Sequence, residues 1–279
     1  MPTISRMHVQ HRVHSHDNTS RLESAAQRTS HGLIPEAVLQ QRAPLVLTLS
    51  GAGCDPCLFD GVRVEGIAWY AVDWFQGEGA FDPESVAQRL ADALASRAGP
   101  TLIAGHSLGG FIALLMAIRH GQHVQGLVLS NTGARTEGHG DPGLPDRVRT
   151  DWTPANQQSF LRACFMHEPP PALWSRLCQY LAHLPAERLL AAVTGLRKLD
   201  VSGELGRVRC PTLIAHGRFD RRRTEAAAQL MADGIVGAQL DWLPGGHTPM
   251  VDCPDDYQQS LQAFLTRTGF IEPRPLERP

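Results

Sequence analysis

The sequence lacks the marks of a membrane-spanning, secreted or nucleic-acid-binding protein. No apolar run approaches the ~20 residues that a helix needs to cross a bilayer. Residues 1–41 are largely polar and rich in histidine, without the apolar stretch of a signal peptide. The formal net charge is only −2, which gives no electrostatic footprint for nucleic acid or an anionic membrane surface. We therefore expect a cytoplasmic protein with neither of these partners.

Cysteine is also scarce, with 6 in 279 residues. A disulfide framework would need a denser set. Only Cys54 and Cys57 are close in sequence. A redox role for this pair would need a thioredoxin-like unit, which is not evident, and a zinc site would need a second pair of ligands. We expect ordinary reduced thiols, no metal and no organic cofactor.

The composition is that of an ordinary globular protein, with 42% hydrophobic and 19% charged residues, and the length suits one large domain or a domain with an insertion. Residues 1–43 contain few apolar side chains, so we expect a polar, flexible extension there. Residues 269–279 are expected to form a C-terminal tail. A flexible metal-binding tract is the alternative for the extension, because four histidines lie close together in it: His8, His11, His14 and His16.

Between these ends, nearly continuous apolar runs alternate with helical patterns. Such runs are typical of parallel strands that are covered on both faces. The alternation predicts an α/β fold, a doubly wound, mostly parallel sheet whose core comprises residues 44–132 and 201–268. Strands are expected at 45–49, 67–72, from 101 to the Gly105 turn, 124–130, 210–216 and 238–243, and core helices from 83 to near 99, from 111 to near 121, at 224–233 and at 257–266.

The alternation is interrupted at residues 133–200, where no strand is evident. The stretch from 133 to about 145 is rich in Gly and Pro and is expected to be a loop, followed by helices near 154–166, 171–184 and 185–199. An insertion of this kind predicts a helical cap, or lid, over the edge of the sheet. Four of its large side chains could line an acyl pocket or pack within the cap: Trp152, Phe165, Met166 and Trp174.

The segment Gly105-His106-Ser107-Leu108-Gly109 joins a predicted strand to a predicted helix. Gly105 and Gly109 have no Cβ, so strand and helix can approach closely while Ser107 is held in a strained turn with its hydroxyl projecting. A strand, this pattern and a helix form a nucleophile elbow. His106 would point elsewhere on so sharp a turn, and we expect a structural role for it.

Two more polar residues follow strand ends, namely Asp220 and His247. The carboxyl ends of parallel strands meet along one edge of the sheet, where ligands bind. A nucleophilic serine needs a base, and the base needs an orienting acid. Other carboxylates that could be the acid are Asp73, Asp233 and Asp241, whereas the strand ending near Ser130 is followed by Asn131-Thr132, which offers none.

The sequence resembles the α/β-hydrolase superfamily, in particular its small, cap-bearing esterase, lactonase and thioesterase-like branch. Three motifs carry the resemblance, in the order that this fold uses: Gly105-His106-Ser107-Leu108-Gly109-Gly110, Gly217-Arg218-Phe219-Asp220 and Gly245-Gly246-His247-Thr248-Pro249-Met250. It implies that Ser107 is the nucleophile, His247 the general base and then acid, and Asp220 the residue that fixes the tautomer of His247.

The resemblance also implies an oxyanion hole formed by the backbone N–H groups of Ala52 and Leu108. Relatives usually carry His-Gly where this chain has Ser50-Gly51. Because the donor is a backbone N–H group, Ser50 does not remove it.

The expected activity is that of a serine hydrolase, which cleaves a carboxylic ester, lactone or thioester of a small-to-medium acyl substrate through an acyl-enzyme. Acyl transfer or carbon–carbon bond hydrolysis on the same triad are alternatives within enzymes, and a non-catalytic ligand-binding relative is an alternative outside them.

One departure from the resemblance concerns charge. Arg221, Arg222 and Arg223 follow Asp220 directly, with Arg218 just before it. They could form the solvated start of the next helix, although cations there oppose the helix dipole. The other interpretation is an anionic substrate or partner, namely a carboxylate-bearing ester, a CoA thioester or an acidic carrier protein.

Overall fold

The computed structural model describes residues 32–136 and 140–272. The chain divides into the units Met1–His31 and Gly32–Pro279, and the fold below is that of the second unit. The four clustered histidines and the proline-rich residues 273–279 lie outside the described residues, so the predictions made for them stay predictions.

The core is a six-stranded sheet in which all strands are parallel, in the order β2-β1-β3-β4-β5-β6. This confirms the predicted doubly wound sheet. The four inner strands are buried along their whole length, which explains their continuous apolar runs. The strands are β1 (Leu45–Leu49), β2 (Ala68–Val72), β3 (Thr101–His106), β4 (Gly126–Ser130), β5 (Thr212–Gly217) and β6 (Gln239–Leu243).

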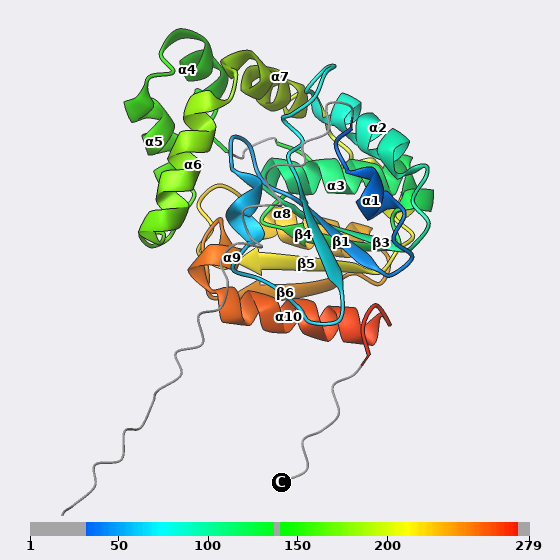
Figure 1. The fold of residues 1–279 in the computed structure, drawn as a ribbon. Coiled ribbons are helices and arrows are strands. Elements are labelled where there is room, and N and C mark those ends of the chain that lie inside the picture. The colour runs from blue at the N-terminus through cyan, green and yellow to red at the C-terminus, as the bar shows by residue number, and fades with distance from the viewer. Residues whose placement is uncertain (1–31, 137–139, 273–279) are drawn as a thin grey trace, which may run out of the picture. The chain divides into compact units, whose positions relative to one another are not determined.

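Helices cover both faces of the sheet (Figure 1). On one face lie α2 (Pro83–Leu94), α3 (Ser107–Arg119) and α8 (Glu225–Gly234), and on the other lies α10 (Pro254–Arg267). Every residue of α3 from Leu108 to Ile118 is buried, because this helix packs between the sheet and α2. The shorter elements are α1 (Glu36–Leu39), α9 (Pro249–Asp252) and the 3-10 helices η2 (Pro56–Phe59), η3 (Gly121–His123) and η4 (Ser202–Arg207).

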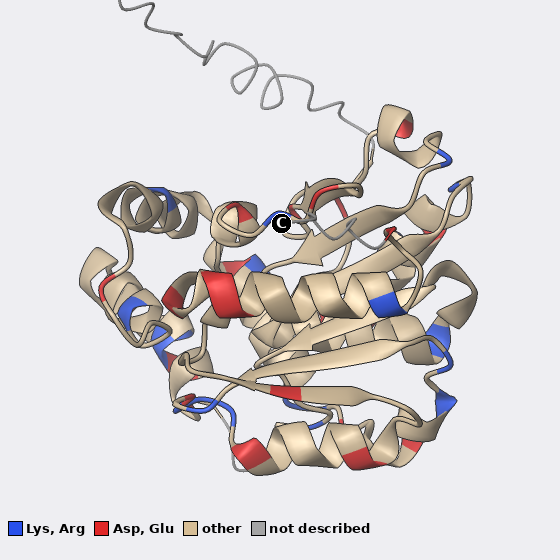
Figure 2. Cartoon of the chain, turned by 90° about the horizontal axis from the view of Figure 1, so that it is seen from below, with Lys and Arg blue, Asp and Glu red and all other residues tan. Residues whose placement is uncertain are grey.

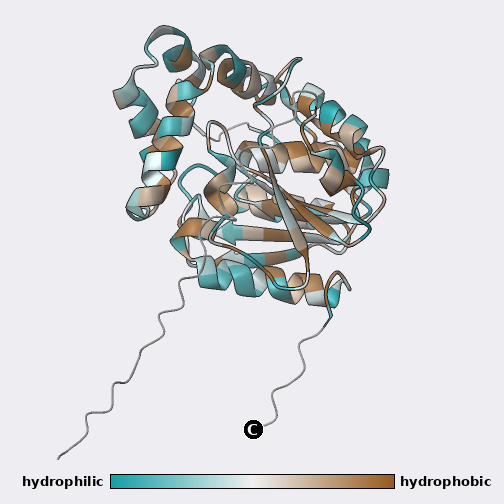
Figure 3. Ribbon diagram, viewed as in Figure 1, coloured by the Kyte–Doolittle hydropathy of each residue, from teal (hydrophilic) through white to brown (hydrophobic). Residues whose placement is uncertain are grey.

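Charged and apolar residues are distributed differently between the strands and the covering helices (Figure 2, Figure 3). In Figure 2 the acidic and basic residues are interspersed over helices and loops, and the strands are almost free of them. In Figure 3 the strands are largely brown, whereas the visible side of α10 is largely teal. No described helix is long and apolar enough to span a membrane, and all six cysteines carry free thiols.

The ordered fold begins earlier than the sequence predicts. Residues 32–43, assigned above to the flexible extension, contain the short helix α1, and the side chains of Ile34 and Leu39 are buried in the core. Arg97 donates hydrogen bonds to the carbonyl oxygens of Val38 and Ala43, at 3.3 and 2.6 Å. Two apolar anchors and one arginine therefore dock a segment whose composition is otherwise polar.

Four helices lie in the chain between β4 and β5: α4 (Leu144–Thr150), α5 (Pro154–Arg162), α6 (Pro171–His183) and α7 (Ala186–Leu196). Figure 1 shows them beyond the end of the sheet toward which β5 points. Tyr180 on α6 donates to Asp73 at 2.6 Å, and Arg188 on α7 donates to the carbonyl of Phe75 at 2.6 Å. These contacts tie the helices to loops of the core. Their movement as a lid stays a prediction.

The sheet has a topological switch point, at which the chain reverses the direction in which it adds strands. From β1 the chain moves outward to β2, and from β3 it moves the other way to β4, so the switch point lies between β1 and β3. In doubly wound folds, ligands bind outside the carboxyl ends of the strands at this point. Here β1 is followed by the Ser50–Ala52 turn, and β3 is followed by Ser107.

Candidate active site

Ser107 occupies the sharp turn that the sequence predicts. Its φ is 52°, in the left-handed region that side chains other than glycine rarely adopt. A Cβ on Gly105 would overlap the carbonyl oxygen of Gly109, and a Cβ on Gly109 would overlap that of Leu49. The two glycines thus permit the close packing of β3, α3 and β1 that fixes the turn, and the elbow geometry is confirmed.

His247 lies on the loop between β6 and α9, beside Ser107. Its Nε2 is 3.0 Å from Ser107 Oγ, and its Nδ1 is 2.8 Å from Asp220 Oδ2. The carboxylate accepts the Nδ1–H, so Nε2 carries the lone pair that accepts the serine hydroxyl proton. Burial lowers the pKa of His247 below its ordinary value, Asp220 opposes this, and the charges of Arg222 and Arg223 add to it. The ring is therefore neutral near pH 7, as a proton acceptor must be.

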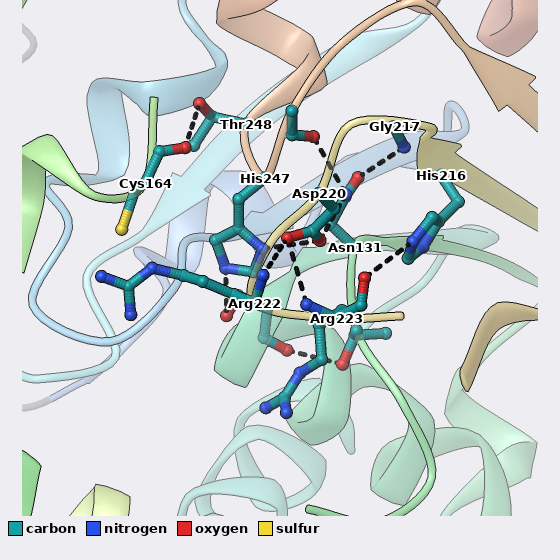
Figure 4. Close-up of polar contacts among 12 residues, drawn as sticks. Asn131, Cys164, His216, Gly217, Asp220, Arg222, Arg223, His247 and Thr248 are labelled. Carbon is teal, nitrogen blue, oxygen red and sulfur yellow. Dashed lines mark hydrogen bonds and ion pairs between the residues drawn. The ribbon is translucent and has the colours of Figure 1, made fainter. Parts of the chain in front are cut away.

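The side chain of Asp220 is fully buried and accepts four hydrogen bonds (Figure 4). Its Oδ1 accepts from the backbone N–H groups of Arg222 and Arg223, at 2.7 and 3.1 Å. Its Oδ2 accepts from His247 and from Asn131 Nδ2, the latter at 2.7 Å. Burial alone would raise the pKa of this carboxyl, but His247 and these hydrogen bonds hold the pKa well below its usual value. Asp220 thus stays ionised beside the imidazole.

Asn131 is a site residue that was not predicted from the sequence. At its position, only the absence of a carboxylate after β4 was considered. The side chain is buried and bridges three loops: Nδ2 also donates to the carbonyl of Gly246 at 3.0 Å, and Oδ1 accepts from Gly217 N–H at 3.2 Å. Its φ is 46°. Asparagine tolerates this conformation better than most residues, and an Asn directly after a buried strand is the signal that could have marked it.

Thr132 and His106 form hydrogen bonds that stabilise the elbow and the adjacent loop of His247. Thr132 Oγ1 donates to the carbonyl of Ser107 at 2.7 Å. His106 Nε2 donates to the carbonyl of His247 at 2.8 Å, and burial lowers the pKa of His106 to about 3. The neutral His106 ring holds the loop that carries His247, in line with the structural role expected for it.

The other carboxylates considered as the acid are engaged elsewhere. Asp73 accepts from Tyr180, Asp233 from Gln229 at 2.8 Å, and Asp241 from Ser260 at 2.5 Å. Asp220 is the one of the four that is bonded to His247.

Ala52 and Leu108 line the same pocket as Ser107. Leu108 is the second residue of α3, where a backbone N–H has no partner within the helix. At the other turn, Trp74 Nε1 donates to the carbonyl of Ser50 at 2.9 Å, and a Cβ on Gly51 would lie 3.1 Å from Ser107 Cβ. The Ser50 turn therefore lies against the elbow. Donation by both N–H groups to an oxyanion stays a prediction.

An open pocket lies over Ser107 and His247, with about 640 Å³ of empty space when the part open to solvent is included. Its apolar wall comes mainly from the inserted helices, but not from the four residues considered above. Trp152 instead packs edge-on against Phe160, and Trp174 lies against the guanidinium of Arg162. The apolar side chains from the insertion that line it are Leu144, Phe160, Cys164, Val193 and Leu196.

The four arginines on either side of Asp220 differ in exposure. Arg218 and Arg221 are exposed, as expected of a solvated helix start. Arg222 is partly buried and Arg223 is buried, and both line the pocket. Over the described part of the chain, no group of three His, Cys, Asp or Glu side chains could hold a metal ion.

A model of the alpha/beta hydrolase family matches residues 46–258, most of the chain. The chain belongs to this family. The match includes Ser107, Asp220 and His247, and family membership supports hydrolase activity.

Among curated relatives, a protein of Variovorax paradoxus provisionally named carbamate hydrolase RutD is 28% identical over 186 residues, which are 60% of this chain and 66% of the relative. A 3-oxoadipate enol-lactonase 2 of Acinetobacter baylyi is 26% identical over 167 residues, 58% of this chain and 62% of the relative. The chain thus covers slightly less than two thirds of the length of each.

Solved structures show the same fold. An enol-lactonase from Burkholderia xenovorans LB400 has a TM-score of 0.70 at 21% identity, covering 81% of this chain and 92% of the other. An esterase from Exiguobacterium antarcticum has a TM-score of 0.72 at 20% identity, with the same coverage. At this level of identity the likeness concerns the fold alone.

Proposed function

We propose that this α/β hydrolase is a serine hydrolase that cleaves a carboxylic ester, lactone or thioester of a small-to-medium acyl substrate. The observation that carries the proposal is the continuous chain of hydrogen bonds from Ser107 Oγ through His247 to Asp220, at 3.0 and 2.8 Å, at the base of a largely apolar pocket. This is the arrangement that a serine needs to become a nucleophile near neutral pH.

In the proposed reaction, Ser107 Oγ attacks the substrate carbonyl while His247 Nε2 takes the hydroxyl proton. The carbonyl oxygen becomes an oxyanion, which the N–H groups of Leu108 and Ala52 bind. His247 then gives the proton to the leaving group, and an acyl-enzyme remains on Ser107. Water, deprotonated by His247, attacks the acyl-enzyme and releases the acid. Asp220 keeps the Nδ1–H of His247 in place and stabilises the imidazolium in both steps.

The substrate class follows from the chemistry that this arrangement can do and from the pocket. Relatives bear names of a carbamate hydrolase and an enol-lactonase, which both describe attack on an acyl carbon next to a heteroatom. The apolar wall contributed by Leu144, Phe160 and Leu196 suits an acyl chain or a small ring. Acyl transfer and carbon–carbon bond hydrolysis use the same nucleophile and differ in the acceptor or the bond cleaved.

A fluorophosphonate probe tests the mechanism, because it labels only an activated serine. We expect labelling of the wild type, none of Ser107→Ala, and wild-type labelling of Ser159→Ala, which removes an exposed hydroxyl from α5. Absence of labelling in folded wild type would overturn the serine mechanism and favour a ligand-binding relative.

A panel of 4-nitrophenyl esters, lactones, carbamates and acyl-CoA thioesters tests the substrate class. We expect a free acid as the product, and no turnover by Ser107→Ala. If the rate depended on an added alcohol or amine acceptor and the product were its acyl derivative, the protein would be an acyltransferase instead.

A further inference from the structure

The burial of Arg223 is energetically unfavourable unless its guanidinium binds an acceptor. It is only 7% exposed, and no described residue accepts a hydrogen bond from its Nε or Nη1. Burying a guanidinium costs free energy unless its N–H groups are paired. It also lies two residues before α8, where a positive charge opposes the helix dipole. Burial lowers its pKa to about 10, so the group still carries its charge near pH 7.

The adjacent arginines in the pocket differ from it, because their guanidinium groups are occupied. Arg222 Nε donates to the carbonyl of Ala163 at 3.1 Å, and its Nη2 donates to that of Phe160 at 2.9 Å. Arg197 donates to the carbonyl oxygens of Pro142 and Asp141. In Figure 4 the side chains of Arg222 and Arg223 leave the loop in different directions, that of Arg222 toward Cys164 and that of Arg223 away from it.

The carboxylates around Arg223 are also occupied. Asp220 already accepts its four hydrogen bonds, one of them from the backbone rather than the side chain of Arg223. Asp141, which lines the pocket, forms an ion pair with Arg147. The described lining therefore holds three guanidinium groups against one carboxylate that is already paired. The described lining thus has a net positive charge, and Nε and Nη1 of Arg223 are buried donors with no acceptor among the described residues, at the same pocket as Ser107.

We infer that Arg223 binds a carboxylate of the substrate, so that the preferred substrate is a small ester or lactone that carries a free carboxylate in addition to the acyl group that Ser107 attacks. A planar guanidinium pairs with a carboxylate through two parallel N–H···O bonds. The inference rests on the proposed serine hydrolase function. It assigns the selection of the substrate to Arg223 and not to the other arginines of the run.

Two matched esters test it: mono-4-nitrophenyl adipate, which carries a carboxylate, and 4-nitrophenyl hexanoate, which has the same chain length and none. The quantity to compare is the ratio of kcat/KM for adipate to that for hexanoate. A charged hydrogen-bonded contact changes binding by about 10- to 100-fold. We expect Arg223→Gln to lower the ratio by this amount and Arg223→Lys to restore part of it. Arg221→Gln removes the same charge from the exposed neighbour and should leave the ratio unchanged.

A wild-type ratio near one, or a ratio that survives Arg223→Gln, overturns the inference and leaves the proposed hydrolase intact. Hexanoyl-CoA is the further arm: if Arg223→Gln impairs it as strongly as the adipate ester, the recognised anion belongs to the carrier, and the inference is wrong.

Calorimetry separates failure of the inference from failure of the proposed function. Monomethyl adipate, which carries one free carboxylate, and methyl hexanoate, which carries none, are titrated into Ser107→Ala, where no turnover occurs. We expect monomethyl adipate to bind at least about 10-fold more tightly than methyl hexanoate. Equal binding overturns the inference, whether or not any ester is hydrolysed. If circular dichroism shows that Arg223→Gln does not fold, the Ser107→Ala titrations and Arg223→Lys decide.

Discussion

Asn131 donates a hydrogen bond from Nδ2 to Oδ2 of Asp220 at 2.7 Å, to the same oxygen that accepts the Nδ1–H of His247. The amide therefore fixes the carboxylate from the side opposite the loop of Arg222 and helps keep its pKa low. Asn131 also binds Gly246 and Gly217, so one side chain sets the distance between the loops that carry the acid and the base.

Removal of this amide should slow the reaction without weakening substrate binding. Asn131→Gly keeps the positive φ accessible and removes the donor. A hydrogen bond to a charged group is worth about 1.5–3 kcal/mol, and we expect kcat to fall by about 10-fold or more with little change in KM. The measurement is steady-state kinetics on a neutral 4-nitrophenyl ester. A wild-type kcat would show that Asn131 does not position Asp220.

Asn131→Asp is the matched variant, since it keeps the shape and adds a second carboxylate beside Asp220. Like charges at this distance disfavour each other's ionised form, and the added charge favours the imidazolium of His247. We expect the acid limb of the pH–rate profile to move to higher pH in Asn131→Asp relative to Asn131→Gly. Coincident profiles would contradict this arrangement of charges.

The wild-type pH dependence follows from the protonation state of His247. The base must be neutral to accept a proton, and burial lowers the pKa of its ring below the ordinary 6.5. The inactive, protonated form therefore accumulates only at acid pH. We expect kcat/KM to be constant near neutrality and to fall as the pH drops through an apparent pKa below 6.5.

Rates between about pH 4 and about pH 9 would give this profile, with circular dichroism at each acid point to separate titration from unfolding. An acid limb at or above the ordinary histidine value would mean that burial does not govern the free enzyme's base.

The close approach at the elbow makes a prediction about stability. A Cβ at Gly109 would overlap the carbonyl of Leu49, whereas one at Gly206 meets nothing within 4 Å. Overpacking of a buried site costs about 1–3 kcal/mol or more. We expect Gly109→Ala to lower the free energy of unfolding by at least this amount and Gly206→Ala to change it by less than about 0.5 kcal/mol. Denaturant titration measures both, and equal effects would show that the elbow is not tightly packed.

The sheet and the positions of Ser107, Asp220 and His247 at its edge could be predicted because both depend on local signals. The inner strands are buried on both faces, so each appears as an unbroken apolar run, and β1 was predicted at its observed bounds. Ser107 and Asp220 follow such runs, whereas His247 follows the edge strand β6, whose residues are mostly only partly buried. Parallel strands end at a common edge, so strand prediction alone brings these three residues together.

What the sequence did not predict depends on contacts between distant segments. The hydrogen bond between Asn131 and Asp220 joins residues 89 apart. An Asn directly after a buried strand marks Asn131 as a candidate, but it does not identify its partner. Helix α4 was not predicted, since the expected loop ended near residue 145 and the next expected helix began near 154. The helix starts among Gly and Pro residues, and only Leu144 and Val148 of its side chains are buried. The burial of Arg223 but not Arg221 is set by packing around the pocket, which four consecutive polar residues do not reveal.

Arg222 offers the last prediction, because it links the acid loop to the pocket wall. Its guanidinium donates to the carbonyls of Phe160 and Ala163 and lies 5.1 Å from the ring centre of Phe160. Arg222→Gln removes these interactions at the end of α5. We expect faster hydrogen exchange at residues 160–164 than in wild type or in Arg221→Gln, since a segment held by fewer hydrogen bonds opens more often.

The kinetic outcome should differ from that of Arg223→Gln. Loosening of the pocket wall lowers kcat/KM for any acyl chain, so the values for the adipate and hexanoate esters should fall together, with their ratio within about twofold of wild type. A selective loss of the adipate ester would mean that Arg222, despite its bonds to Phe160 and Ala163, recognises the carboxylate. The two arginines are adjacent and carry the same charge, so this separation would follow from their different hydrogen-bond partners, burial and side-chain directions (Figure 4).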